Sequence, residues 1–249
     1  MTTQTTPITA TTETDVAQWV SRFGEWVFAQ LDDIAALLQA PLAKVAPRRS
    51  DLAIEERCRS LLADPRTPVA GAGAVLAPYV LADAPYCLEW WTAEYRGGAP
   101  IIAKLATETD PRAIGFRDYT ELPWYARPLE TGERHVTGPY VDYVCTDQYT
   151  LTFTQPLVVG GSFAGVVGAD VLVAWFEERL LQVMTAVDRT CVLVNAAGRV
   201  VTSSDPTWVT GDLLRGLPLE AWLSGDRRHH PQWTATVCDG LPFLVLTPR

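Results

Sequence analysis

The alternation of apolar and polar residues is clearest over residues 150–171, where it predicts a β-hairpin. Leu151 and Phe153 alternate with three threonines, so one face of the first strand packs on a core and the other presents hydroxyl groups. Gly160-Gly161-Ser162 then leads through a short loop into a second apolar run. Two glycines within this second run indicate a bulge or a group packed close to the backbone. The pattern therefore predicts a small pocket against this sheet.

Helical spacing of apolar residues dominates the N-terminal part of the chain. It extends from Thr14 to Gln39, where Pro41 closely follows, and predicts a long amphipathic helix. Two tryptophans, Trp19 and Trp26, lie in this stretch. Such a helix either covers its own domain or also packs on a second subunit, and periodicity does not separate the two.

Shorter elements fill the region between this helix and the hairpin. A cap at Ser50 or Asp51 predicts a second helix that runs to Ala63. Apolar runs separated by proline and glycine predict three strands. These strands are expected at Gly73–Leu76, Tyr86–Thr92 and Pro100–Thr107. The aromatic stretch Asp118–Leu129 predicts a short helix or turn that crosses the sheet.

The C-terminal part of the chain shows a similar succession of elements on a smaller scale. Helical spacing over Val173–Val187 predicts a connecting helix, and Ala196-Ala197-Gly198 marks a further hairpin. The strands expected here are Thr190–Asn195, Arg199–Ser203, Trp233–Val237 and Phe243–Leu246. The complete order of elements predicts an α+β fold with a smaller C-terminal α/β module.

Composition limits the classes of partner. The 249 residues are 48% hydrophobic and 20% charged, which is ordinary for a globular protein. Lys and Arg number 20 against 29 Asp and Glu, giving a net charge of −9. Nucleic acid is not expected as a partner, because neutralising phosphates requires a basic surface. The charge is compatible with a cationic ligand.

The chain start and the cysteines bear on the compartment. Residues 1–14 have no basic and apolar stretches of a secretory signal, and no run approaches the length of a membrane span. We therefore expect a soluble, cytoplasmic protein with no membrane partner. Five cysteines at widely spaced positions, without a C-x-x-C pair, predict free buried thiols.

Aromatic residues and carboxylates suggest a ligand site. The strongest set is Trp124, Tyr125, Tyr140 and Asp142, with Trp90, Trp91, Phe116, Tyr143 and Asp170 as further wall residues. Tyr140 and Asp142 are two apart on a strand and should face the same side. A carboxylate among aromatic rings suits a ligand ammonium group. Alternatively, the aromatic residues are core and Asp142 caps a loop or pairs with Arg127 or Arg134.

Three sequence segments, taken in order, resemble the Cache family of ligand-sensing domains. They are D-Y-T-E-L-P-W-Y at 118–125, P-Y-V-D at 139–142 and G-V-V-G-A-D at 165–170. The resemblance covers about sixty residues well. It implies a central antiparallel PAS-like sheet with crossing helices. It also favours a homodimer through the N-terminal helix, and a role for Asp118 and Tyr119 in seating the short helix.

The amino-acid-sensing members of this family carry Y-x-x-x-x-R-x-W-Y, followed later by Y-x-D, in which the arginine clamps the ligand carboxylate. Trp124, Tyr125 and Asp142 match these motifs, as does Tyr140. Leu122 stands at the arginine position, so the natural carboxylate partner is lost while the ammonium partner remains. The resemblance therefore favours the amine-recognising branch. Arg117, at the leading tyrosine position, keeps an amino-acid ligand open.

The resemblance also divides the chain into segments. These are a mobile tail (1–12), a helical segment (13–64), the ligand-binding domain (65–173), a connecting helix (174–187) and a shortened second PAS-like module (188–249). The last segment is about sixty residues long, and we do not expect it to hold a roomy pocket.

Other chemistries have little support in the sequence. His229 and His230 are adjacent and cannot aim both rings at one ion, and His135 lacks acidic or cysteine neighbours at ligand spacing. The glycine pairs lack the lysine of a phosphate loop, and no nucleophile motif is present. We expect no metal and no cofactor.

These observations predict a cytoplasmic sensor or binding protein for an amine or other cationic metabolite. A ligand would shift a dimer between two states, and the output would pass to an unidentified downstream protein. One alternative is a small enzyme acting on amines, with Asp142 as general base and Tyr125 as proton donor. Another is a module that binds a protein partner through the N-terminal helix.

Overall fold

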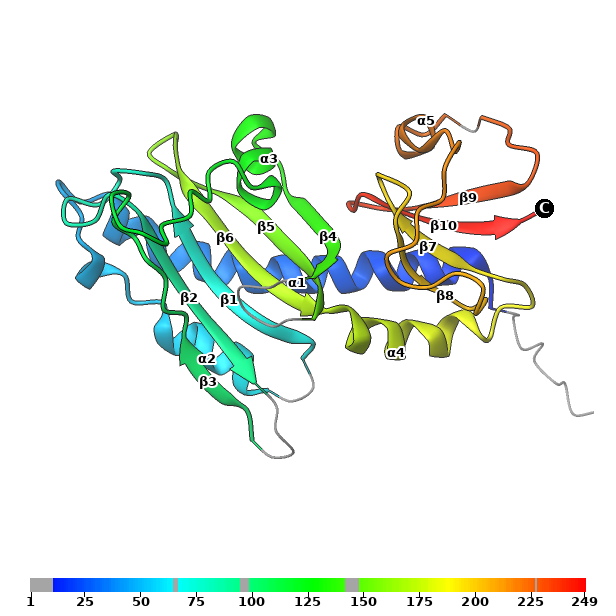
Figure 1. Ribbon diagram of the computed structural model, residues 1–249, viewed down its shortest axis with the longest axis horizontal. Coiled ribbons are helices and arrows are strands. Elements are labelled where there is room, and N and C mark those ends of the chain that lie inside the picture. The colour runs from blue at the N-terminus through cyan, green and yellow to red at the C-terminus, as the bar shows by residue number, and fades with distance from the viewer. Residues whose placement is uncertain (1–10, 65–66, 95–98, 142–147, 227) are drawn as a thin grey trace, which may run out of the picture. The chain divides into compact units, whose positions relative to one another are not determined.

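The computed structural model describes residues 11–64, 67–94, 99–141, 148–226 and 228–249 (Figure 1). The chain clusters into two compact units. The larger unit is Gly24–Phe176, and the smaller unit is Glu177–Arg249 together with the N-terminal segment that ends at Phe23. The predicted α+β class is confirmed, since a long helix precedes two antiparallel sheets.

The N-terminal helix, α1, runs from Glu13 to Leu42, as the apolar spacing predicted. Its buried side chains recur three, four or seven positions apart, so they form one stripe. They include Val20, Val27, Leu31, Ile34 and Leu38. Burying each such side chain stabilises the fold by about 1.5–3 kcal/mol. None of the helices in the described ranges combines the length and hydropathy that crossing a bilayer requires.

Thr11 and Thr12, the described residues that precede α1, make backbone contacts. Thr11 forms a β-bridge with Val187. The backbone N–H of Thr12 donates to Asp15 Oδ2 at 2.7 Å, while the backbone N–H of Asp15 donates to Thr12 O at 3.0 Å. These reciprocal bonds satisfy groups that a helix start leaves without intrahelical partners.

The second helix begins later than predicted. The segment Arg49–Asp51 is a short 3₁₀ turn, η1, and α2 runs from Glu55 to Ala63. Asp51 does not cap α2, because its carboxylate accepts from Arg48 N at 2.8 Å and from Lys44 Nζ at 2.7 Å. The sequence cap signal therefore marked this turn.

Six antiparallel strands form the sheet of the larger unit. They are β1 (Val69–Leu76), β2 (Cys87–Glu94), β3 (Ile101–Lys104), β4 (His135–Val141), β5 (Tyr149–Val159) and β6 (Ser162–Leu172). Their order across the sheet is β3-β2-β1-β6-β5-β4, so β1 and β6 are central (Figure 1). The predicted hairpin is β5 and β6, which turn at Gly160 and Gly161. Both glycines have a positive φ, of 58° and 83°, which other residues adopt only with strain.

The register of the strands defines two faces of this sheet. Gly71, Asp170 and Thr152 are aligned across β1, β6 and β5, as are Gly73 and Gly168, so their side-chain positions share one face. We call it the glycine face. The opposite face carries the leucine and phenylalanine of β5, and α1 packs there through Phe28, whose ring centroid lies 5.5 Å from that of Phe153. We call it the helix face.

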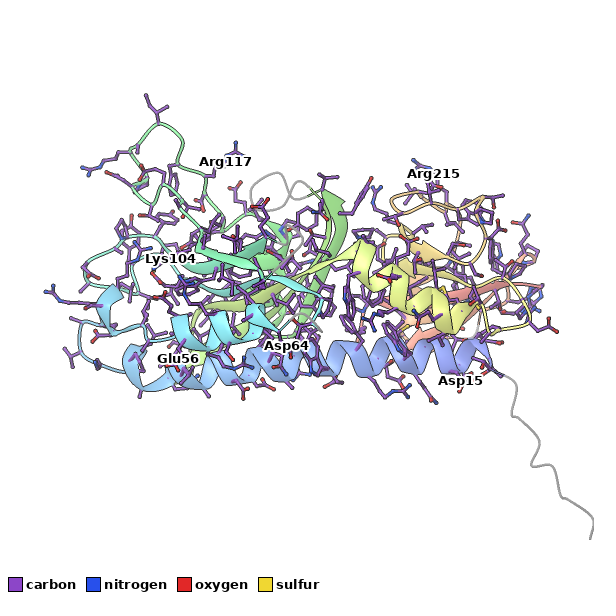
Figure 2. All side chains as sticks on the ribbon, turned by 90° about the horizontal axis from the view of Figure 1, so that it is seen from below. Asp15, Glu56, Asp64, Lys104, Arg117 and Arg215 are labelled. Atoms are coloured by element: carbon purple, nitrogen blue, oxygen red, sulfur yellow. The ribbon has the colours of Figure 1, made fainter. Side chains whose placement is uncertain are left out.

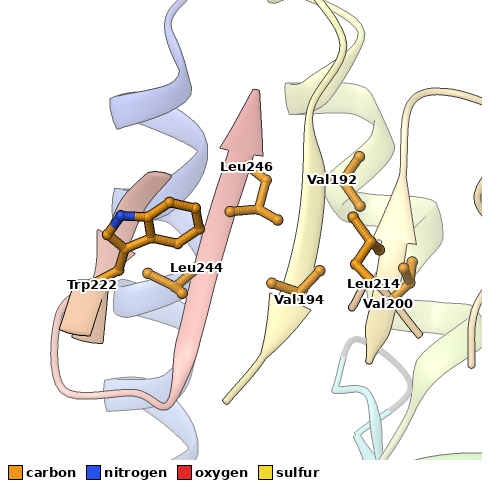
Figure 3. Close-up of a cluster of buried hydrophobic side chains, with 7 residues drawn as sticks. All are labelled: Val192, Val194, Val200, Leu214, Trp222, Leu244 and Leu246. Carbon is orange, nitrogen blue, oxygen red and sulfur yellow. The ribbon is translucent and has the colours of Figure 1, made fainter. Parts of the chain in front are cut away.

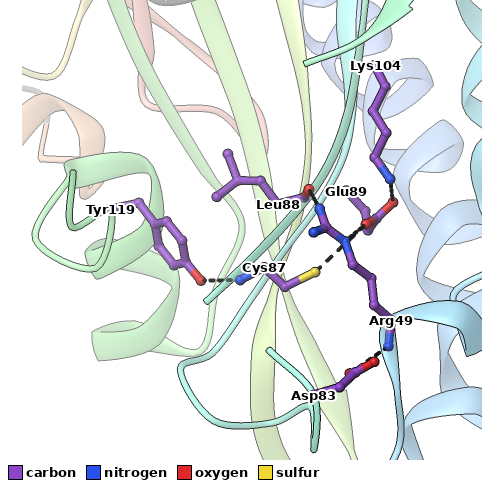
Figure 4. Close-up of polar contacts among 7 residues, drawn as sticks. All are labelled: Arg49, Asp83, Cys87, Leu88, Glu89, Lys104 and Tyr119. Atoms are coloured by element: carbon purple, nitrogen blue, oxygen red, sulfur yellow. Dashed lines mark hydrogen bonds and ion pairs between the residues drawn. The ribbon is translucent and has the colours of Figure 1, made fainter. Parts of the chain in front are cut away.

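A buried acid on the helix face has cationic partners (Figure 4). The Glu89 side chain is 4% exposed, and its Oε1 accepts from Arg49 Nε at 2.6 Å. Its other oxygen pairs with the Lys104 ammonium group. The hydrogen bond that Arg49 donates to Glu89 raises the pKa of Arg49. These partners satisfy a carboxylate that would otherwise be costly to bury, which is a structural role.

The smaller unit contains a four-stranded sheet of order β8-β7-β10-β9. Its strands are β7 (Val192–Asn195), β8 (Val200–Ser203), β9 (Trp233–Cys238) and β10 (Phe243–Pro248), close to the predicted ranges. The predicted connecting helix is α4 (Val173–Met184), and α5 (Leu219–Leu223) was not predicted. Val194, Leu244, Leu214 and Trp222 belong to the core on one face of this sheet (Figure 3).

Four of the five cysteines lie within the described residues: Cys58, Cys87, Cys191 and Cys238. All four are free and buried, as predicted. Cys145 lies outside the described residues. In each of the four, burial raises the pKa of the thiol.

Candidate ligand-binding site

Helix α3 (Pro123–Thr131) presents the first aromatic residues of the site over β4, β5 and β6 (Figure 1). It begins after Leu122, whose extended backbone is typical of a residue before proline, and it ends at Gly132 with a positive φ of 70°. Trp124 and Tyr125 therefore lie in its first turn. Tyr125 is buried and Trp124 is half-buried.

Tyr125 is at the centre of an aromatic cluster. Its ring centroid lies 5.4 Å from that of Tyr119 and 5.6 Å from that of Phe163. The Trp124 ring lies 6.3 Å away, and Trp90 belongs to the same buried cluster. The edge-on and tilted arrangements are those that aromatic quadrupoles favour.

Tyr119 joins the loop before α3 to the sheet. Its hydroxyl donates to Leu76 O at 2.6 Å and accepts from Cys87 N at 3.2 Å (Figure 4). Burial raises the pKa of this hydroxyl. Next to it, Asp118 accepts hydrogen bonds from the backbone N–H and the hydroxyl of Thr120. The expected seating role of Asp118 and Tyr119 is confirmed.

Phe116 extends the aromatic cluster outward. Its ring centroid lies 4.7 Å from that of Tyr86, which in turn lies 5.4 Å from that of Tyr119. Phe116 thus reaches Tyr119 through one intervening ring. Arg117, which kept an amino-acid ligand open, is exposed on the same loop (Figure 2).

The two successive tryptophans of β2 face opposite ways. Trp90 aligns with Gly73 and belongs to the glycine face. Trp91 aligns with Lys104, whose ammonium group lies 5.2 Å from the centroid of the indole ring on the helix face. The prediction that both tryptophans wall one pocket is wrong, because consecutive strand residues point to opposite sides.

Three polar side chains form a hydrogen-bonded line on the glycine face. The Thr152 hydroxyl donates to Asp170 Oδ1 at 2.7 Å, and Tyr140 Oη lies 2.7 Å from Thr152 Oγ1. A threonine hydroxyl has a single proton, so Tyr140 must be the donor to Thr152 when Asp170 is ionised. All protons along the line then point toward the Asp170 carboxylate, which is 3% exposed.

Glycine at position 71 brings this line close to Trp90. A Cβ atom at Gly71 would lie 2.8 Å from Asp170 Oδ2 and 2.8 Å from Trp90 Nε1. At Gly168 a Cβ atom would lie 3.0 Å from Thr154 Cγ2 and 3.2 Å from Trp90 Cη2. The absent side chains allow the indole and the carboxylate to approach the same point above the sheet. Trp90 thereby joins the polar line to the aromatic cluster.

Several buried polar atoms of this face have no partner within the described residues. They are Trp90 Nε1, Thr154 Oγ1 and Thr137 Oγ1. Thr137 and Thr154 align with β5 and β6 positions of the glycine face. Burying a polar atom without a hydrogen bond costs about 1–3 kcal/mol, so such atoms usually meet a ligand or an ordered water.

Burial changes the acid–base behaviour of two residues near this face. It raises the pKa of Tyr125 to about 12, which keeps the phenol protonated at neutral pH. It lowers the pKa of His135, the first residue of β4, and the nearby positive charge of Arg127 lowers it further. At neutral pH these two side chains therefore carry no charge.

Asp142 and Tyr143 lie outside the described residues, directly after the end of β4 at Val141. Their place in the site stays a prediction. The two arginines considered as partners of Asp142 have acidic partners elsewhere. Arg127 pairs with Glu130 at 3.2 Å, and Arg134 pairs with Glu25 at 3.1 Å and with Asp32 at 3.5 Å.

The arrangement combines aromatic rings with a line of hydroxyl groups that ends at one buried carboxylate. Such a surface can hold a small cation and orient it through hydrogen bonds. The predicted residues Trp124, Tyr125, Tyr140, Asp170 and Trp90 come to this face. Thr152 was missed, although the alternation along β5 had placed its hydroxyl on the face away from Phe153.

Residues 69–177 match the family described as "Methyl-accepting chemotaxis protein-like, first PDC sensor domain". This segment includes the whole six-stranded sheet and α3. This segment of the chain is therefore similar to a PDC sensor domain. A comparison with curated proteins found no match.

Solved structures of sensor domains share the fold along nearly the whole chain. The extracellular domain of a protein named as a histidine kinase, mmHK1S-Z3, has a TM-score of 0.64 at 17% identity and covers 94% of this chain and 90% of that one. Methyl-accepting chemotaxis protein X has a TM-score of 0.64 at 14% identity, with 94% of each chain covered. The ligand-binding domain of the Pseudomonas aeruginosa PAO1 amino acid chemoreceptor PctC, in complex with GABA, has a TM-score of 0.55 at 17% identity, with 95% of each chain covered.

The comparisons correct the expected location. A cytoplasmic placement is contradicted, because the similar structures include extracellular domains of histidine kinases and the matched family is a chemoreceptor sensor domain. Two of the similar structures are described as extracellular domains instead. The expectation rested on the lack of a signal-like stretch in residues 1–14 and of a membrane-spanning run, and neither feature determines the compartment.

The same comparisons support the expectation that the chain is not an enzyme. The matched family is described as a sensor domain, and the similar structures are named as parts of a histidine kinase and a chemotaxis protein. The alternative of an amine-processing enzyme loses its support.

Proposed function

We propose that this PDC sensor domain binds a small amine or other cationic metabolite on the glycine face. The single observation that carries the proposal is the line from Tyr140 through Thr152 to the buried carboxylate of Asp170, set beside the ring of Trp90. Both hydroxyl protons point along the line, so the carboxylate of Asp170 is the hydrogen-bond acceptor at its end.

The electrostatics of the buried residues favour a cation. Within the described ranges the buried charged side chains are Glu89 and Asp170, both acidic, and no lysine or arginine is buried. Glu89 faces Arg49 and Lys104 on the helix face, so Asp170 is the buried charge of the glycine face. An ammonium group over an aromatic ring gains about 0.5–2 kcal/mol in addition to its ion pair.

Asp142 would supply a second carboxylate in this proposal. It follows β4 directly, and the resemblance to amine-recognising Cache domains assigns it to the ligand ammonium group. Two carboxylates would also suit a ligand with two cationic groups. The Asp142→Asn variant is therefore expected to bind amines more weakly than the native protein.

An amino acid is the second candidate, and a specific observation favours it. The structure of the PctC domain contains GABA, which has a carboxylate as well as an ammonium group. On the glycine face Trp90 Nε1 is a buried N–H donor without a partner among the described residues, and it could serve that carboxylate. The two ligand classes differ in whether the ligand carries a carboxylate in addition to its ammonium group.

We propose that signalling proceeds by population shift between two states of a dimer formed through α1. Its outward side exposes Trp26 and Leu37, at 36% and 45%. A ligand shifts such an equilibrium only through different affinities for the two states. The downstream partner would then be another part of a signalling protein or a separate protein.

Matched pairs of compounds test the ligand class. Propylamine and GABA differ by one carboxylate, as do isobutylamine and L-valine, and choline adds a permanent cation. A ligand at one hundred times its dissociation constant stabilises the folded protein by about 2.7 kcal/mol. This corresponds to a rise in melting temperature of about 5–10 °C. We expect the amines to give this rise.

Two variants with a matched control locate the site. Asp170→Asn and Thr152→Val should each reduce amine affinity at least tenfold in calorimetric titrations. Thr150→Val removes an equally buried hydroxyl of the same strand, which donates to Gln148 O at 3.2 Å, and should keep affinity. Rises confined to amino acids would contradict the amine assignment. Equal affinity in all three variants would place the ligand elsewhere.

A further inference from the structure

The smaller unit contains a cavity of about 510 Å³ where no roomy pocket was expected. Its volume lies in the range of about 300–1,000 Å³ typical of small-molecule sites. The cavity opens at one end of the four-stranded sheet, next to Trp233 of β9 and Pro248 of β10, which are paired in register. The sequence did not indicate this cavity because residues 208–217 and 230–232, which supply much of its wall, have no periodic pattern.

Two indole rings form the apolar part of the wall. The ring centroids of Trp208 and Trp233 lie 6.4 Å apart in an edge-to-face arrangement. Both indoles pack against the buried core cluster that contains Leu214 (Figure 3), so this part of the wall is anchored. Both indoles are only partly buried, which leaves ring surface available for a planar ligand.

The polar part of the wall is rich in hydrogen-bond donors. His230 Nδ1 accepts from Gln232 N at 3.3 Å, so the neutral ring carries its proton on Nε2. The edge of this ring lies against Trp222, with 6.0 Å between the ring centroids. Gln232 adds a side-chain amide to the wall.

Arg215 gives the cavity a positive charge. It lines the cavity and is exposed on its loop (Figure 2). Among the described residues, the side chain of Arg215 forms neither an ion pair nor a hydrogen bond. Other arginines of the unit are engaged: Arg199 donates to Gly211 O, Arg228 pairs with Asp226, and Arg249 donates to Trp233 O.

The charge distribution along the sequence agrees with an anionic ligand. Residues 188–249 contain six arginines and six acidic residues, so the net charge of −9 resides entirely in the preceding part of the chain. Two of the six acids are held in local turns: Asp205 accepts from Thr207, and Asp212 accepts from Val209 N at 3.0 Å. The C-terminal segment that builds the cavity is thus electrically distinct from the rest of the protein.

We propose that this cavity is a second ligand site, which binds a small aromatic carboxylate. The guanidinium group of Arg215 binds the carboxylate through paired hydrogen bonds, and the aromatic ring stacks against Trp208 and Trp233. His230 Nε2 and the Gln232 amide serve further acceptor atoms of the ligand. The site lies wholly in the smaller unit and does not depend on the function proposed for the glycine face.

Phenylacetate is the probe for a calorimetric titration of the whole chain. Its matched compounds are phenylacetamide, which lacks the charge, phenethylamine, which reverses it, and cyclohexylacetate, which lacks the aromatic ring. We expect phenylacetate to bind at least tenfold more tightly than each of the three. Absence of phenylacetate binding, or equal affinity for phenylacetamide, overturns the proposal.

Substitutions at two exposed arginines test whether phenylacetate binds in this cavity or in the larger unit. Arg215→Gln should weaken phenylacetate binding at least tenfold, and Trp208→Ala should weaken it as well. Arg117→Gln changes an equally exposed arginine of the larger unit and should leave phenylacetate binding unchanged. Loss of binding in Arg117→Gln with retention in Arg215→Gln overturns the assignment. Unchanged melting temperatures without ligand would show that the variants are folded.

Discussion

His135 illustrates how burial at a single residue makes stability depend on pH. It is the first residue of β4, it is half-buried on the glycine face opposite Thr154, and burial lowers its pKa below the ordinary value of 6.5. The unfolded chain therefore binds a proton at His135 more readily than the folded protein does. Stability consequently rises with pH through the window below 6.5 and falls as pH decreases through it.

Replacing His135 with glutamine should reduce this acid sensitivity. We expect the native protein to lose more stability than His135→Gln between pH 7.5 and pH 5, with each unit of pKa difference worth about 1.4 kcal/mol. Urea unfolding at three pH values measures the difference. The carboxylates titrate in both proteins, so they cancel in the comparison. Parallel pH profiles would show that His135 does not contribute.

At the residue scale, the sequence indicated which residues belong to the site better than it indicated the direction in which each side chain points. Trp124 and Tyr125 were found from a motif, and the structure places both beside Trp90. Trp91 was assigned to the same wall from its residue type alone, although the predicted strand contained both tryptophans and a strand alternates sides at each residue. The importance of Thr152 depends on a hydrogen bond to Asp170 on a different strand, which no local pattern reveals.

At the scale of the elements, the packing of β1 against β2 requires a residue without a side chain at position 73. At Gly73 a Cβ atom would lie 2.0 Å from the carbonyl oxygen of Glu89 and 2.8 Å from Trp90 Cα, both backbone atoms of β2. The backbone of a central strand cannot move aside without disturbing its partners. The close approach of β1 and β2 therefore requires glycine at this position.

The Gly73→Ala substitution should destabilise the larger unit by about 2–3 kcal/mol or more, because the added methyl group overpacks the sheet. Gly132→Ala is the matched control. At Gly132 no atom of the described residues lies within 4 Å of the place an added methyl group would take, so only its positive φ of 70° opposes alanine, at about 1–2 kcal/mol. Chemical unfolding of both variants compares the two effects. A smaller loss for Gly73→Ala than for Gly132→Ala would contradict this account.

The elements differ in how well the sequence predicted them. The β5–β6 hairpin was predicted within a few residues, because alternation and the Gly160-Gly161 turn agree. Strand β1 begins at Val69, four residues before its predicted start, since both of its faces are buried and its small residues show no alternation. Helix α5 has only five residues, fewer than two turns, so it carries too little periodicity to be detected.

At the scale of the whole molecule, the two proposed sites lie in different compact units and have opposite charge. The glycine face of the larger unit has a buried carboxylate, and the cavity of the smaller unit has an exposed arginine. The proposed ligands therefore differ in charge, and the two sites that would bind them have no residue in common. Neither ligand should occupy the site of the other.

Simultaneous binding is the prediction that follows. A titration with an amine in the presence of saturating phenylacetate should still show one amine per chain, and both ligands together should raise the melting temperature more than either alone. The Arg215→Gln variant, which should lose only the phenylacetate contribution, is the control. Mutual exclusion of the two ligands would show that they share one site.

Burial of the thiols affects how readily the cysteines are oxidised outside a reducing cytosol. Burial raises the pKa of Cys58 to about 12 and those of Cys87 and Cys191 to about 11, so these thiols are protonated at pH 7. The thiolate is the form that reacts with oxidants and with disulfides. These three cysteines should therefore persist chemically unchanged in an oxidising compartment without a crosslink to protect them.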